Sequence, residues 1–86
     1  MKPSFNEQCQ MLQSVASKVI EAVMTEGRYH GYQAEWLDMT DKDHMAHVED
    51  HAMSFRCGDK KESHVTHAAV RALMACWAEL NRSGNA

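Results

Sequence analysis

The sequence predicts an all-α domain, a small bundle of three helices. Three stretches carry apolar residues at the spacing of one helix face, each begins with a helix-capping pattern, and no stretch alternates apolar and polar residues as strands do. Its 86 residues form a single helical domain, 1–86. A chain of this length buries a small core, so we expect oligomerisation to complete the bundle.

The first helix is predicted at about 5–25. Ser4 and Glu7 have the spacing of a capping box, in which each side chain bonds the backbone amide of the other residue. Gly27 marks the expected end. One side of this helix is apolar: Met11, Leu12, Val15, Ala16, Val19, Ala22 and Val23.

An aromatic connection, "EGRYHGYQAEWLDM" at 26–39, separates the first helix from the second. The second helix is predicted at about 41–55, with Thr40 as its N-cap and acidic residues in its first turn. Its expected buried stripe consists of Met45, Val48, Ala52 and Phe55.

The third helix is predicted at about 60–80. Gly58 ends the preceding helix, and Asp59 with Glu62 suggests a second capping box. The short connection predicts an antiparallel pair of helices. The third helix has a wide apolar face, which predicts contacts on two sides and therefore a homodimer or higher homo-oligomer; a plain monomeric core is the alternative.

Charge and cysteine content exclude several classes of protein. The net charge is −3, and half of the acidic residues lie between Glu35 and Asp50, which argues against binding to nucleic acid. No apolar run is long enough to cross a membrane. Cys9, Cys57 and Cys76 are odd in number and widely spaced, so we expect a cytoplasmic protein without disulfides.

Two stripes of histidine follow the second and third helices. His44, His47 and His51 are spaced i, i+3 and i+7, and the same spacing joins His64 and His67 to Arg71. In an antiparallel pair both stripes could line one groove with nearby carboxylates, a combination suited to a metal or an anion. Alternatively, the histidines are incidental residues at the edges of two buried faces.

The order of three segments resembles the short all-α MazG-like family of dATP/dGTP diphosphohydrolases, often carried by phages. These segments are "EGRYHGYQAEW" at 26–36, "DHAMSFRCGD" at 50–59 and "ESHVTHAAVRALMACWAEL" at 62–80. The resemblance extends over about 19–80. The chain differs from the family's paired-glutamate signature, since His64 and His67 stand in place of the second acidic pair.

The resemblance implies a nucleoside triphosphate pyrophosphohydrolase that uses Mg²⁺ or Mn²⁺ to activate water. It implies catalytic roles for Glu49, Asp50 and Glu62. The implied metal ligands are Asp50, Asp59, Glu62, His47 and His51. The nucleotide would contact His51, His64, His67, Arg71 and Trp36. The alternative is a small acidic protein of phage type that sequesters a nucleotide or inhibits a host protein without catalysis.

Overall fold

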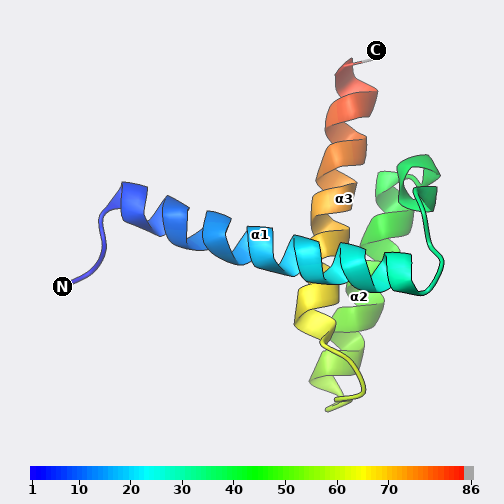
Figure 1. Cartoon of the computed structure of the whole chain (residues 1–86), viewed down its shortest axis with the longest axis horizontal. Helices are drawn as coiled ribbons and strands as arrows, with labels where there is room; N and C mark the ends of the chain where they lie inside the picture. The colour runs from blue at the N-terminus through cyan, green and yellow to red at the C-terminus, as the bar shows by residue number, and fades with distance from the viewer. Residues whose placement is uncertain (85–86) are drawn as a thin grey trace.

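The computed structural model describes residues 1–84 and confirms an all-α fold of three packed helices. Helix α1 spans Phe5–Tyr29, α2 spans Asp41–Arg56 and α3 spans His64–Gly84 (Figure 1). A short 3-10 helix, η1, occupies Glu35–Asp38 within the aromatic connection. No strand occurs among the described residues.

Helix α1 begins as predicted but is longer than predicted. The capping box of Ser4 and Glu7 is present. The expected end near residue 25 is wrong, because the helix continues through Gly27 and ends at Tyr29. The terminator is Gly31, whose φ of 89° lets the amides of Gly31 and Tyr32 bond back to carbonyls of the last turn.

Helices α2 and α3 form the predicted antiparallel hairpin (Figure 1). Thr40 caps α2, and Asp43 completes a capping box there. At the open end of the hairpin, Arg82 of α3 forms a bidentate ion pair with Asp41 of α2. Hydrogen bonds from the Arg82 guanidinium lower the pKa of Asp41 below its ordinary value.

The predicted start of α3 at residue 60 is wrong: the helix begins at His64. Gly58, with a φ of 85°, ends α2 in a turn where its amide bonds Phe55 and the amide of Asp59 bonds Ser54. The carboxylates of Asp59 and Glu62 then approach histidines and do not cap a helix. At its other end α3 extends past the predicted limit of residue 80 to Gly84.

The buried interior is small and half polar. Among the described residues its apolar part is Val70 and Ala75, and its polar part is His44 and His64. The predicted buried stripe of α2 is wrong in its rotation about the helix axis, since Met45 is 43% and Phe55 59% exposed. The face that α2 turns toward α3 carries histidines, because both His44 and His51 contact side chains of α3.

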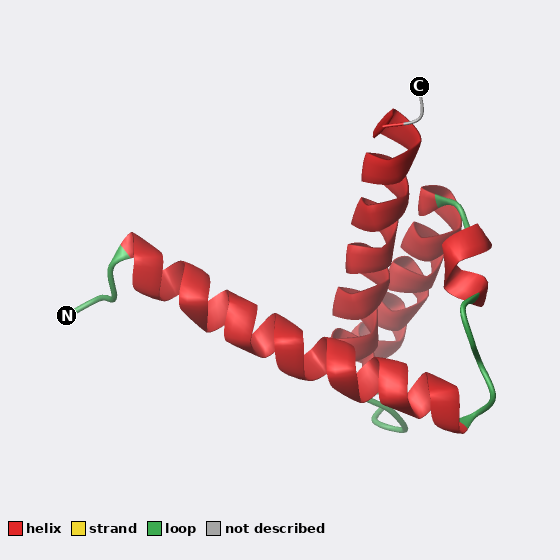
Figure 2. Cartoon of the chain, turned by 45° about the horizontal axis from the view of Figure 1, so that its top comes forward, coloured by secondary structure: helices red, strands yellow, loops and turns green. Residues whose placement is uncertain are grey.

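Helix α1 crosses α3, and its N-terminal half extends away from the hairpin (Figures 1 and 2). Its C-terminal part is anchored beside the hairpin, where Glu26 lies 3.6 Å from the imidazole of His67. No helix in the described range is long and apolar enough to cross a membrane.

Candidate metal centre

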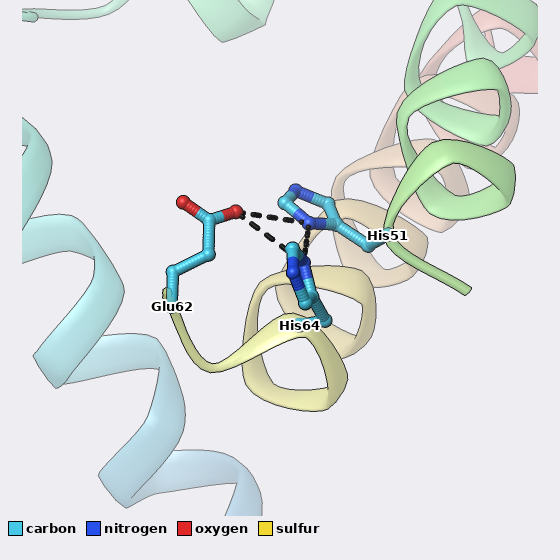
Figure 3. Close-up of side chains that lie close together, drawn as sticks. All are labelled: His51, Glu62 and His64. Atoms are coloured by element: carbon cyan, nitrogen blue, oxygen red, sulfur yellow. Dashed lines mark hydrogen bonds and ion pairs between the residues drawn. The ribbon is translucent and has the colours of Figure 1, made fainter. Parts of the chain in front are cut away.

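Three side chains converge at the closed end of the hairpin: His51 from α2, Glu62 from the connection and His64 from α3 (Figure 3). The Nδ1 atoms of the two histidines are 3.0 Å apart. Oε1 of Glu62 lies 3.2 Å from Nδ1 of His51 and 3.5 Å from Nδ1 of His64. Three potential ligand atoms therefore form a nearly equilateral triangle.

The local fold explains why these residues meet. His51 is one and a half turns from the end of α2, and His64 is the first residue of α3. The turn at Gly58 reverses the chain at once, so the two helices run side by side from their connected ends. The same turn leaves the connection 57–63 beside both imidazoles, where Glu62 can reach them.

Asp59 fixes the orientation and tautomer of His64. Nε2 of His64, a residue that is 7% exposed, donates a hydrogen bond to the Asp59 carboxylate. With its proton on Nε2, the neutral imidazole presents the lone pair of Nδ1 toward His51 and Glu62. A carboxylate that holds the far nitrogen of a histidine is the arrangement that metal ligands commonly have in proteins.

His51 is held from its other side by His67. The two rings stack with centroids 5.3 Å apart and an interplanar angle of 17°. His67 itself is fixed by a hydrogen bond from its Nδ1 to the Ser63 carbonyl and by Glu26 of α1. Burial lowers the pKa of His51, an effect that Glu62 opposes and that neighbouring histidines reinforce. The neutral imidazole, the form that binds metals, is therefore favoured.

The spacing of the three atoms suits a common metal ion. Ligand atoms bound to a four-coordinate Zn²⁺ at about 2.0–2.1 Å stand about 3.3 Å apart. The separations of 3.0, 3.2 and 3.5 Å bracket that value. With two imidazoles and one carboxylate as ligands, a fourth position is left for water or a substrate.

A second group of predicted site residues lies at the other end of the hairpin. His44, fully buried, donates from Nε2 to the carbonyl of Trp36 and accepts at Nδ1 from the Arg71 guanidinium. The indole of Trp36 packs edge-on against Trp77. Seven helical residues, about 10 Å, separate His44 from His51. His44 and His51 of the α2 stripe thus contact the α3 stripe, whereas His47 is exposed. Trp36 and Arg71 belong to this second, structural cluster.

The remaining predicted residues are divided between the site and the surface. His67 and Asp59 support the two histidine ligands without joining the ligand triangle. His47, Glu49 and Asp50 are exposed on α2 and lie outside the ligand group found among residues 1–84.

Sequence reasoning missed Arg56 and Phe55 as site residues. Both line a groove of about 200 Å³ that also contains His51, His64 and Val65. Phe55 follows His51 by four residues and so lies on the same side of α2, whereas apolar periodicity alone predicts Phe55 in a buried stripe. The groove is largely apolar and lies directly against the histidine pair.

Comparisons with protein-family models, with curated proteins and with solved structures give no match for this chain. The resemblance to the MazG-like family stays a prediction. Any functional assignment therefore depends on the geometry of the site.

Proposed function

We propose that the protein binds one divalent transition-metal ion through His51, Glu62 and His64, and that Zn²⁺ is the preferred ion. The observation that carries the proposal is the triangle of ligand atoms, with all three separations between 3.0 and 3.5 Å. Asp59 holds the far nitrogen of His64, which is the outer support that metal-bound histidines commonly have. The ring of His67 stacks on His51 and limits its rotation.

The ligand types favour Zn²⁺ over the Mg²⁺ or Mn²⁺ that the resemblance to the MazG-like family implies. Imidazole suits Zn²⁺ and the neighbouring first-row metals, whereas Mg²⁺ prefers oxygen ligands and retains several waters. Only Glu62 supplies oxygen within the ligand triangle. When bound, such an ion would act as a Lewis acid on a water or an oxygen ligand in its open position.

Calorimetric titration of the purified chain with Zn²⁺ at neutral pH tests the proposal. We expect one ion per chain and an affinity for Zn²⁺ at least about 100-fold higher than for Mg²⁺. A variant with Cys9, Cys57 and Cys76 all replaced by serine serves as control, because exposed thiols also bind zinc. If binding disappears in this variant, or if the wild-type chain binds no ion, the proposal is wrong and the cluster is an internal hydrogen-bond network.

The surroundings of the site favour a nucleoside triphosphate as the substrate. Arg56 lines the groove and supplies positive charge for phosphate groups, and two more cations, Lys60 and Lys61, directly precede Glu62 in the sequence. Phe55 and Val65 supply apolar surface in the same groove for a base. We therefore retain pyrophosphohydrolysis of (d)NTPs as the candidate reaction.

Incubation with dATP or dGTP and stoichiometric Zn²⁺ or Mn²⁺, followed by pyrophosphate detection, tests that reaction. We expect release that requires metal and falls in an Arg56→Ala variant, because the guanidinium flanks the groove. Lys42→Ala, a change on the same helix outside the groove, is the matched control. A nucleotide that raises the melting temperature but is recovered intact would instead support the sequestering protein considered from the sequence.

A further inference from the structure

The N-terminal half of α1, residues 5–16, is an unpaired helical arm. Figures 1 and 2 both show it extending beyond the crossing with α3. Its large apolar side chains are exposed to solvent: the exposed fraction is 76% for Phe5, 73% for Leu12 and 57% for Val15. Exposure of this extent over three turns of one helix costs free energy that a covering surface would recover.

The apolar side chains of α1 form one heptad stripe. Phe5, Leu12 and Val19 are seven residues apart, and Cys9, Ala16 and Val23 form a second row four residues after the first. This alternation of four and three residues is the pattern of helices that pack lengthwise against another helix. Val19 and Val23 are half-buried in the protomer, as are the smaller Cys9 and Ala16, whereas the large stripe residues of the arm, Phe5 and Leu12, are exposed.

The charge pattern of the arm fits a second copy of the same helix. No charged residue occupies the stripe or the positions that flank it, namely Asn6, Gln8, Gln13, Val15, Ile20 and Ala22. The charges of α1 up to residue 23, Glu7, Lys18 and Glu21, lie on the opposite side. Two identical arms can therefore meet without like charges facing each other, which an interface between identical helices requires.

The chain as a whole exposes more area than a compact monomer of its mass, which leaves enough surface for an interface between two copies. A compact monomer of 9.8 kDa exposes about 5,200 Å², whereas this chain exposes 7,085 Å². The excess, about 1,900 Å², lies in the range that one protomer buries in an obligate homodimer. The radius of gyration is 14.6 Å, against about 12 Å for a compact chain of this length.

We propose that the protein is a homodimer in which the arm of one protomer packs along the arm of the other about a twofold axis. The occupant of each stripe is the second copy of α1. This interface is separate from the His51–Glu62–His64 centre, and the proposal stands whether or not that centre binds a metal.

Light scattering coupled to gel filtration tests the dimer. We expect twice the 9.8-kDa chain mass for the wild-type protein and the single-chain mass for Leu12→Glu, which places charge in the stripe. Ser14→Glu adds the same charge on the opposite side of the arm and should remain dimeric. A monomeric wild-type protein, or equal disruption by both variants, would overturn the proposal.

Alkylation of Cys9 gives a test that needs no substitution. Cys9 lies in the stripe, whereas Cys57 is exposed in the connection after α2. In the dimer, Cys9 should react more slowly as the protein concentration rises, and Cys57 should not change. This measurement decides the proposal even where Leu12→Glu loses its helical circular dichroism. A dimer with unprotected Cys9 would show that another surface forms the interface.

Discussion

Replacing His44 with alanine is expected to lower the free energy of unfolding by about 3 kcal/mol. The imidazole is fully buried and bridges the Trp36 carbonyl, 3.0 Å away, and the Arg71 guanidinium, 3.2 Å away. Alanine leaves a cavity together with two polar groups that lose their partners. Urea denaturation followed by circular dichroism, at one fixed protein concentration, measures the change.

His47→Ala is the matched control for this substitution. His47 is on the same helix, one turn further along, and is exposed. Its loss should change the free energy of unfolding by no more than about 0.5 kcal/mol. Similar losses in the two variants would mean that the bridge from η1 through His44 to α3 does not stabilise the fold.

Replacing His64 with alanine is expected to reduce Zn²⁺ binding below detection by calorimetry. The change leaves two ligands, His51 and Glu62, and removes the residue that Asp59 orients. Asp59→Asn keeps all three ligands and alters only the support, so a loss of about 10- to 100-fold in affinity is expected. If the affinity for Zn²⁺ of Asp59→Asn lies between those of the wild type and His64→Ala, His64 is a ligand and Asp59 supports it.

The zinc-binding experiment on His64→Ala needs a folding check and two control variants. His64 is buried, so retention of helical circular dichroism must be checked before a loss of binding is assigned to the ligand. His47→Ala and His30→Ala remove exposed imidazoles outside the ligand triangle and should bind Zn²⁺ as the wild-type chain does. Weakened binding in either variant would place the ion elsewhere on the histidine-rich surface.

The helices could be predicted because their signals are local. The capping box at Ser4 and the N-cap at Thr40 depend on residues within one turn, and the structure contains both. The end of α1 could not be predicted in the same way, because the sequence does not distinguish Gly27 from Gly31 as its terminator. Only Gly31 adopts the positive φ that lets the following amides bond back to the helix.

The site could be predicted only in part because it depends on rotation and on loop conformation. Apolar periodicity predicted that Met45 and Phe55 face the core, yet contacts with α3 turn His44 and His51 inward. The spacing of Asp59 and Glu62 fits a capping box equally well. The close approach of their carboxylates to His64 and His51 follows from the turn at Gly58 and could not be read from spacing.

The small interior has a consequence for how the fold is held together. His51 and His64 lie on opposite sides of the Gly58 turn, so one ion bound to both would join α2 to α3 as a disulfide joins two segments, although all three cysteines are free. Unfolding would then have to release the ion, and the free energy of metal binding would add to that of folding. In a domain whose buried apolar side chains are Val70 and Ala75 among the described residues, metal supply would thereby set how much of the protein is folded.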